Sequence, residues 1–232
     1  MMTTAYSKEQ IEELLRTERF PYHRVELPYG LHTPGQDRSA TRDLVLPTSL
    51  DGQTLLDIGC ALGYFCFEAE KRGASRVLGI EMNEKRHRHA LQLKAVLESR
   101  VEFARADILA EPPGEQFDTV LFLNVIHHLR EPMRALRQVA ALTRERLVIE
   151  FPDFGDEKFK LSAGIRFPWI YNRLPLIGVS SLAKATDQTF VFTAGAIRRV
   201  LQDHEPLFSD IKFMRSPMAG RQIAVCTKTA ST

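Results

Sequence analysis

The sequence has few of the residues on which small disulfide-bonded or metal-bound proteins depend. Its 232 residues include three cysteines and one tryptophan. Cys60, Cys66 and Cys226 form no Cys-x-x-Cys pair. This spacing excludes a zinc knuckle and a disulfide framework as the basis of the fold, and it favours reduced thiols.

An excess of charge of one sign is also missing. The 31 Lys and Arg residues nearly balance the 29 Asp and Glu residues, which leaves a net charge of +2. No strong overall field is available to hold a polyphosphate chain, so the charge favours a small-molecule substrate and gives no support to a nucleic-acid partner, although it does not exclude a local basic patch.

Long apolar runs are absent as well. The most apolar region, near Pro168–Leu182, is interrupted by charged, proline and glycine residues, and the first ten residues have no charged-then-apolar leader. We therefore expect a cytoplasmic protein without a membrane span. The sequence does not indicate an oligomeric state.

The sequence does contain a regular alternation of strand-like and helix-like segments. Short apolar runs predict strands at Leu55–Ile58, Val77–Ile80, Val101–Phe103, Thr119–Leu123 and Leu147–Phe151. Helices are predicted at Tyr64–Arg72, after Asn83 and from Pro132. Alternation of this kind predicts an α/β, Rossmann-like parallel sheet with helices on both faces. Phe208–Met214 and Arg221–Thr227 predict an antiparallel addition at the C-terminal end.

Two segments fall outside this alternation. Residues 1–50 begin with a Ser7-x-x-Gln10 capping box and continue into a segment rich in Pro and Gly, which we expect to form a lid over a cofactor or substrate. A Thr193-capped helix resumes the pattern after an aromatic insertion at about 152–192. We expect residues 51–232 to form one domain that carries this insertion.

The most informative motif is the loop that follows the first strand, Asp57-Ile58-Gly59-Cys60-Ala61-Leu62-Gly63. Its glycines allow the backbone to approach a ligand closely, as in nucleotide-binding sheets. A dinucleotide fingerprint would need glycine where Ala61 and Tyr64 stand. Asp57 would repel a pyrophosphate, whereas it can receive a cationic amine.

Acidic residues also follow the next strands. Glu81 stands 24 positions after Asp57 and can accept both hydroxyls of a ribose. Asp107 can accept from an adenine amine, and the Ile108 N–H can serve a ring nitrogen. Asn124 is expected near the amino-acid end of the ligand. Three acids without a phosphate-binding cation describe a nucleoside joined to an amino acid, which is S-adenosylmethionine.

From about residue 55 to 150 the sequence resembles the class I S-adenosylmethionine-dependent methyltransferases, with the Asp57–Gly63 loop as their motif I. The resemblance implies that the loop residues Asp57, Gly59, Cys60 and Gly63 hold the methionine part, that Glu81 holds the ribose, that Met82 packs on the adenine, and that Asp107 and Ile108 read its edge.

Arg24–Leu27 and Gly30–Gly35 resemble the branch that forms 5-oxyacetic acid (carboxymethyl) groups on the wobble uridine of tRNA. Its tRNA-acting members are longer and carry an extra helical region and a basic surface that we do not find here. The resemblance thus implies O-methylation of a small-molecule hydroxyl, on a sugar or natural product. The alternatives are alkylation of tRNA, with the ordinary or the carboxylated cofactor, and a non-catalytic methyltransferase-like binding module.

A base for a hydroxyl acceptor is expected next to the methyl group. His127 and His128 directly follow Asn124-Val125-Ile126 and are the catalytic candidates, although a structural pair has the same pattern. Glu150 and Asp153 are rival bases or metal ligands. Spacing alone establishes no metal site, and none is assigned.

Acceptor contacts are predicted from the lid and the insertion. The candidates are His32, Asp153, Phe154, Trp169 and Tyr171. His32 is otherwise an exposed residue, and the aromatic residues are otherwise the insertion's own core. The basic run Lys85–His89 is expected to be a solvated helix face.

Overall fold

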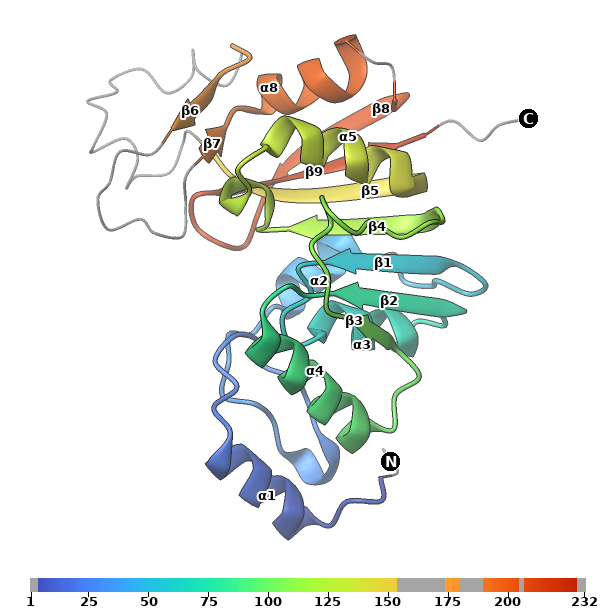
Figure 1. Cartoon of the computed structure of the whole chain (residues 1–232), viewed down its shortest axis with the longest axis vertical. Coiled ribbons are helices and arrows are strands. Elements are labelled where there is room, and N and C mark those ends of the chain that lie inside the picture. Colours follow the sequence, from blue (N-terminus) through green and yellow to red (C-terminus); the bar gives the residue numbers. More distant parts are fainter. Residues whose placement is uncertain (1–3, 154–173, 180–189, 205–206, 229–232) are drawn as a thin grey trace. The chain divides into compact units, whose positions relative to one another are not determined.

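The computed structural model describes residues 4–153, 174–179, 190–204 and 207–228. The chain divides into two compact units, Met1–Glu111 and Pro112–Thr232. The seven strands of a mostly parallel main sheet are divided between them, three in the first unit and four in the second (Figure 1). The α/β, Rossmann-like fold class predicted above is confirmed.

The first unit contains a three-stranded parallel part of the sheet in the order β3-β2-β1. Its elements are α1 (Lys8–Thr17), the 3-10 turn η1 (Pro28–Gly30), α2 (Ser39–Val45), β1 (Thr54–Ile58), α3 (Tyr64–Lys71), β2 (Arg76–Ile80), α4 (Glu84–Leu97) and β3 (Glu102–Ala104). Helix α3 packs on β1 and β2, and α4 packs on β3. Buried apolar strand residues such as Leu55, Leu56 and Val77 form the core.

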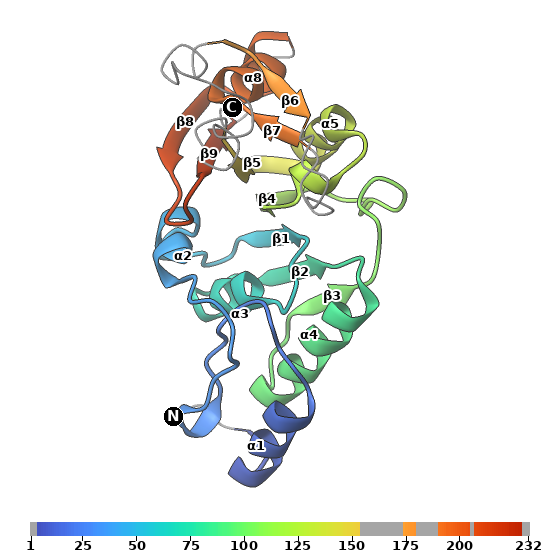
Figure 2. The same cartoon turned by 90° about the vertical axis from the view of Figure 1, so that its left-hand side faces the viewer.

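Helix α1 begins where the sequence predicts. Ser7 Oγ accepts a hydrogen bond from the Gln10 N–H at 3.3 Å, and Gln10 Oε1 accepts one from the Ser7 N–H at 2.7 Å. After α1 ends, Glu18 Oε2 lies 3.1 Å from Nε2 of the buried His89 in α4. This contact helps to fix α1 beside α4, as Figures 1 and 2 show.

The segment from Tyr22 to Gln36 is folded back on itself. Its backbone makes hydrogen bonds from Arg24 N to Gln36 O at 2.9 Å and from Gln36 N to Tyr22 O at 3.0 Å. At Gly35 a Cβ would lie 2.3 Å from the carbonyl carbon of His23, so only glycine fits there. The expected irregular segment is therefore packed by backbone contacts, and the helix α2 that follows it is absent from the sequence prediction.

The second unit contains strands in the order β4-β5-β9-β8 and a separate pair, β6-β7. Its elements are β4 (Phe117–Leu123), η2 (Ile126–His128), α5 (Pro132–Leu142), β5 (Thr143–Pro152), β6 (Ile177–Val179), β7 (Phe190–Phe192), α8 (Ala194–Arg198), the π-helical turn η3 (Arg199–His204), β8 (Asp210–Arg215) and β9 (Arg221–Thr227). Strand β4 is parallel to β5, whereas β9 is antiparallel to both β5 and β8. This confirms the predicted C-terminal hairpin.

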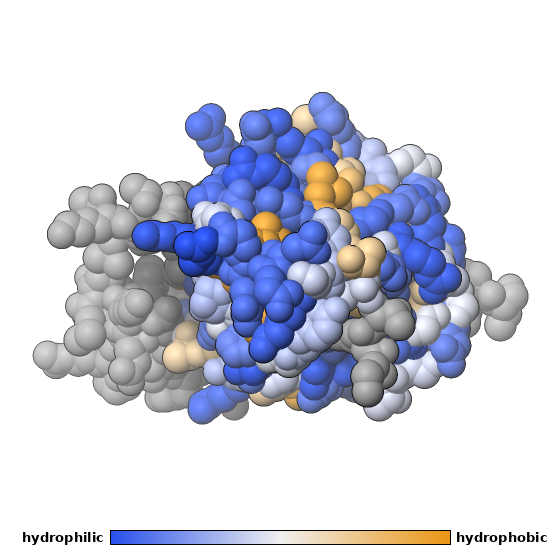
Figure 3. All heavy atoms as spheres, turned by 90° about the horizontal axis from the view of Figure 1, so that it is seen from below, coloured by the Kyte–Doolittle hydropathy of each residue, from blue (hydrophilic) through white to orange (hydrophobic). Residues whose placement is uncertain are grey.

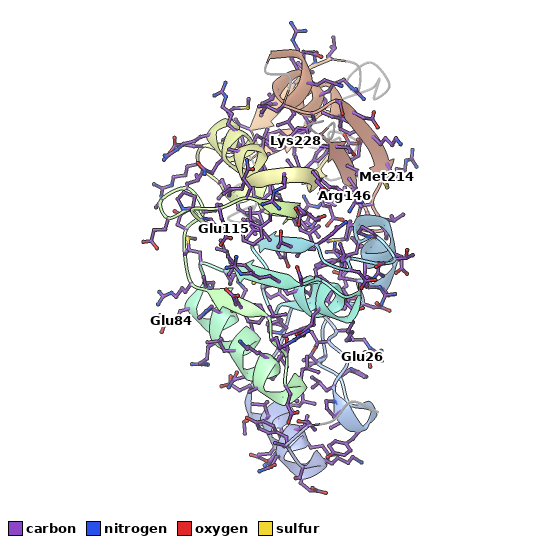
Figure 4. All side chains as sticks on the ribbon, turned by 90° about the vertical axis from the view of Figure 1, so that its right-hand side faces the viewer. Glu26, Glu84, Glu115, Arg146, Met214 and Lys228 are labelled. Atoms are coloured by element: carbon purple, nitrogen blue, oxygen red, sulfur yellow. The ribbon has the colours of Figure 1, made fainter. Side chains whose placement is uncertain are left out.

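Helix α5 places its apolar side against β4 and β5. Ala135, Leu136 and Val139 are fully buried. Near the end of this helix, the ammonium group of Lys228 donates to the carbonyl oxygen of Ala140 at 2.9 Å. Lys228 is labelled in Figure 4. The Ala140 carbonyl oxygen also accepts the Thr143 N–H, so Lys228 is its second partner and places a positive charge at the negative end of the helix dipole.

The face of the molecule seen in Figure 3 is mainly polar. On the face shown in Figure 3, hydrophilic side chains predominate and apolar ones form only small groups. No helix within the described ranges combines the length and the apolar composition that a bilayer crossing requires.

Candidate functional site

The loop between β1 and α3 is held in an unusual backbone conformation. Gly59 has φ 74°, Ala61 has φ 51° and Gly63 has φ 80°, all in the left-handed region. The N–H groups of Gly59 and Cys60 both donate to the carbonyl oxygen of Ile80, at 2.7 and 3.1 Å. These bonds fix the loop at the carboxyl end of β2.

The ring of Phe103 closes the space beside two glycines. A Cβ at Gly63 would lie 2.5 Å from this ring, and a Cβ at Gly79 in β2 would lie 2.7 Å from it. A Cβ at Gly79 would also lie 2.9 Å from Sγ of Cys60. Gly63 is thus required by both its backbone angle and its neighbour, whereas Gly79 is required by its neighbours alone.

Asp57 lies at the end of β1 and is buried. The thiol of Cys66 donates to its Oδ2 at 3.5 Å. Burial raises the pKa of Asp57 to about 7; the negative charge of Glu81 adds to this rise, while the Cys66 hydrogen bond and the charge of Arg38 oppose it. The carboxyl group is therefore poised to ionise when a cationic group binds beside it.

Glu81 follows β2 and is also buried. Its Oε2 accepts a hydrogen bond from the Ala61 N–H at 3.1 Å, and its Oε1 accepts one from the Asn83 N–H at 2.8 Å. The guanidinium Nε of Arg86 lies 3.2 Å from Oε1. Glu81 thus stabilises the left-handed conformation of Ala61.

The predicted adenine residues follow the same strand ends. Met82 is 62% exposed. Asp107 follows β3 and accepts the Leu109 N–H at 2.9 Å, and Ile108 is buried. The Glu81 N–H donates to the carbonyl oxygen of Ala104 at 3.1 Å, which ties the ends of β2 and β3 together.

The basic run at the start of α4 differs from the prediction of a solvated face. Lys85 and Arg88 are exposed, but Arg86 reaches Glu81 and His89 is buried against Glu18. The prediction is wrong for these two residues because α1 and the Tyr22–Gln36 segment pack on that side of the helix.

Two residues near the loop were missed by the sequence analysis. Arg38 is buried, its guanidinium carbon lies 5.6 Å from the centroid of the Phe65 ring, and its Nε donates to Thr41 Oγ1 at 3.3 Å. The His23 ring lies 5.9 Å from the ring of Tyr64, at the start of α3. Burial, with the charge of Arg38, lowers the pKa of His23 to about 4, so this imidazole is neutral at physiological pH.

In the second unit, Asn124 follows β4 with φ 57°. Its N–H donates to the carbonyl oxygen of Glu150 at 2.9 Å, and its Nδ2 donates to Oε2 of the same residue. The hydroxyl of Ser216 donates to Oε1 of Glu150. Both carboxylate oxygens of the fully buried Glu150 are therefore engaged, and they fix the orientation of Asn124.

His127 and His128 lie in η2 with ring centroids 4.0 Å apart. His127 is buried and His128 is exposed. Burial lowers the pKa of His127 to about 2, and the charges of His128 and Arg221 add to this effect. His127 is thus neutral at physiological pH and holds a proton poorly.

Asp153 directly follows β5 and forms a bridge with Phe192 of β7. Gln222 Nε2 in β9 donates to its Oδ2 at 2.8 Å, and the Asp153 N–H donates to the Gly220 carbonyl oxygen at 3.0 Å. Its Oδ1 is buried and has no hydrogen-bond partner.

Of the remaining predicted site residues, one lies within the described ranges. His32 is exposed, with Nδ1 3.1 Å from the carbonyl oxygen of Thr33. Phe154, Trp169 and Tyr171 lie outside the described residues. Within the described ranges, no group of three or more His, Cys, Asp or Glu side chains is arranged to hold a metal ion.

Comparison with known proteins decides the family. A family model described as "Methyltransferase domain" matches residues 35–204. The chain belongs to this methyltransferase family. Membership confirms the predicted S-adenosylmethionine-dependent methyltransferase, both as an enzyme class and in its cofactor.

Curated relatives include tRNA U34 carboxymethyltransferases. That of Alteromonas mediterranea is 30% identical over 190 residues, which cover 72% of this chain and 54% of that protein. That of Cronobacter sakazakii is 32% identical over 181 residues, which cover 71% and 54%. The predicted resemblance to this branch is confirmed, and the chain spans about half the length of these relatives.

Solved structures show the same fold. Magnesium protoporphyrin IX methyltransferase from Synechocystis PCC 6803 with bound SAH has a TM-score of 0.57 and 23% identity, over 78% of this chain and 75% of that one. The N-terminal domain of EvdMO1, in the presence of SAH and D-fucose, has a TM-score of 0.71 and 16% identity, over 97% and 98%. At such identities the likeness concerns the fold alone.

Proposed function

We propose that this methyltransferase transfers the methyl group of S-adenosylmethionine to a hydroxyl group of a small molecule, such as a sugar. The observation that carries the cofactor part is the pair of buried carboxyl groups, Asp57 and Glu81, on either side of a left-handed glycine loop. The register that pairs Ile58 with Ile80 brings these two residues to one edge of the first unit.

Each group at this edge has a complementary part of the cofactor. Ionised Asp57 receives the ammonium group, and Glu81 accepts hydrogen bonds from the ribose hydroxyls. Met82 covers the adenine, and Asp107 accepts from its amine. Arg38 supplies the one buried cation described near the loop, and we assign it to the methionine carboxylate.

Methyl transfer from a sulfonium is an in-line displacement, so the protein must mainly align the acceptor and remove its proton. His128 is the better base of the pair, since its ring is exposed and can pass the proton to water. His127 is disfavoured by its lowered pKa, and Glu150 by the hydrogen bonds on both of its carboxylate oxygens.

Two further observations support a small hydroxylated acceptor. The net charge of +2 provides little general attraction for a nucleic acid. The EvdMO1 domain, which matches nearly the whole length of this chain, was crystallised in the presence of D-fucose, so a protein with this fold can be studied with a deoxyhexose.

Calorimetry on the purified protein tests the cofactor part. S-adenosylhomocysteine should bind with a micromolar-range Kd, equivalent to about −8 kcal/mol, and NAD should give no heat. Radiolabelled S-adenosylmethionine with a panel of sugars and phenols then tests the acceptor. Heat with NAD and none with S-adenosylhomocysteine would overturn the assignment.

Alkylation of tRNA is the second candidate, because the curated relatives are named as tRNA U34 carboxymethyltransferases. Binding of tRNA through several phosphate contacts would make activity fall steeply with added salt. Good turnover of unmodified tRNA, with that salt dependence, would favour this function over the small-molecule one.

A further inference from the structure

Three side chains after β4 and β5 carry a buried polar atom without a hydrogen-bond partner. The atoms are Oδ1 of Asn124, Nδ1 of His127 and Oδ1 of Asp153, all in the second unit. Leaving a buried polar atom unpaired is unfavourable, because its hydrogen bonds to water are lost and not replaced. Three such atoms on adjoining elements indicate that a ligand supplies the missing partners.

The contacts of the second unit bring their elements together. The η2 turn, which carries His127, packs against β5 and β7. Asp153 forms a bridge with Phe192 of β7, and the Asn124 N–H donates to Glu150 near the end of β5. The three side chains therefore belong to one group of packed segments.

The neighbours decide which atom each side chain leaves for a ligand. The Asn124 amide is oriented because its Nδ2 donates to the Glu150 carboxylate, which leaves Oδ1. Asp153 is oriented because Gln222 donates to Oδ2, which leaves Oδ1. An amide oxygen and a carboxylate oxygen can only accept hydrogen bonds, so the ligand must donate at two positions.

We propose that Asn124 and Asp153 form the acceptor subsite and select an uncharged, polyhydroxylated molecule. In this subsite Oδ1 of Asp153 accepts a hydrogen bond from a hydroxyl group other than the one that is methylated. The carboxylates of Glu150 and Asp153 disfavour an anionic acceptor, although Arg221, opposite Pro152 in the register, adds a positive charge. The inference rests on the proposed function and names its substrate class.

The test measures binding of D-fucose by calorimetry, with the protein saturated with S-adenosylhomocysteine. Asp153→Asn keeps the side-chain shape, but Gln222 then faces the amide oxygen and an N–H group faces the ligand. We expect D-fucose binding to weaken about tenfold or more, with the S-adenosylhomocysteine affinity unchanged. Asp210→Asn, at an exposed residue of β8 in the same unit, is the matched control and should leave both affinities unchanged.

Gln222→Leu provides a second variant, in case Asp153→Asn does not fold. It removes the contact that orients Asp153 and should weaken D-fucose binding about threefold. Unchanged D-fucose affinity in these variants would overturn the inference, as would tighter binding of D-fucose 1-phosphate or no D-fucose binding by the parent protein. Failure of the parent protein to bind S-adenosylhomocysteine would instead contradict the proposed function.

Discussion

Among single residues, Asp57 should make cofactor binding depend on pH. Its pKa of about 7 means that the free protein keeps this carboxyl group partly protonated near neutrality, while the ligand ammonium favours the ionised form. The affinity for S-adenosylhomocysteine should therefore rise about tenfold from pH 6 to pH 8. Calorimetry at both pH values measures this, and Asp57→Asn should lose the dependence. If Asp57→Asn shows the same pH dependence of affinity, a different titrating group causes that dependence.

The raised pKa of Asp57 has the opposite effect on the stability of the ligand-free protein. The unfolded carboxyl group ionises near pH 4, whereas the folded one keeps its proton up to about 7, so Asp57 lowers the free energy of unfolding as pH rises through this range. As pH rises, the burial of Asp57 therefore increases the affinity for the ligand and lowers the stability of the ligand-free protein.

Substitution by glycine should be tolerated better at Ala61 than at an alanine inside a helix. Its φ of 51° carries a cost of about 1–2 kcal/mol, which glycine removes while increasing the entropy of the unfolded chain. Thermal unfolding should show Ala61→Gly to be neutral or more stable by up to about 1 kcal/mol. Ala69→Gly, in the interior of α3, should lose about 1 kcal/mol or more. Equal losses at both positions would show that Ala61 is unstrained.

The two histidines should differ in catalysis. His128→Asn should lower kcat by about 10²–10⁴, because proton removal acts at the transition state, while S-adenosylhomocysteine affinity stays the same. His127→Asn should leave the pH profile of kcat unchanged, since this imidazole is neutral throughout. Rate measurements with an accepted sugar from pH 5 to 9 compare them. Full activity of His128→Asn would direct attention to Asp153.

At the level of elements, the start of α8 depends on one buried hydroxyl group. Thr193 Oγ1 accepts the Ala196 N–H at 3.1 Å and the Leu176 N–H at 3.0 Å, and it donates to the Leu174 carbonyl oxygen at 2.6 Å. Thr193→Val keeps the shape but removes these bonds and should cost about 1–2 kcal/mol of stability. Chemical denaturation measures the loss, which Thr193→Ser should largely avoid. Similar losses in both variants would point to the methyl group instead.

How far the sequence predicts these elements depends on what stabilises them. Strands β1, β2, β4 and β5 are predictable because apolar runs form their buried parts, and the order of strand and helix places Asp57 and Glu81 at one edge. Helix α2 is not predictable, since its only buried residues are Thr41 and Val45. Arg38 was missed for the same reason, because it directly precedes this helix and no hydrophobic period marks it as buried. The unpaired Oδ1 of Asp153 could not be predicted either, because the carboxylate is oriented by Gln222, which lies in β9, far along the chain.

For the whole molecule, cofactor binding should be visible as added stability. A ligand that binds only the folded state at one hundred times its Kd adds about 2.7 kcal/mol to the free energy of unfolding. S-adenosylhomocysteine should raise Tm accordingly and slow hydrogen exchange in the Asp57–Gly63 loop and in Pro21–Gly35. NAD serves as the control. Protection confined to the loop would show that the N-terminal segment does not respond to the cofactor.

The ring of Phe103 has a consequence for how the sequence can vary. It fills the space that a side chain would need at both Gly63 and Gly79, so three positions on separate elements are constrained together. An alanine at position 79 would lie 2.7 Å from the Phe103 ring and 2.9 Å from Sγ of Cys60, so it becomes acceptable only when both of these side chains are replaced by smaller ones, because Gly79 needs no left-handed angle. Gly63 gains no such freedom. The order in which substitutions arise would therefore decide which of them survive, with positions 103 and 60 changing first and position 79 only afterwards.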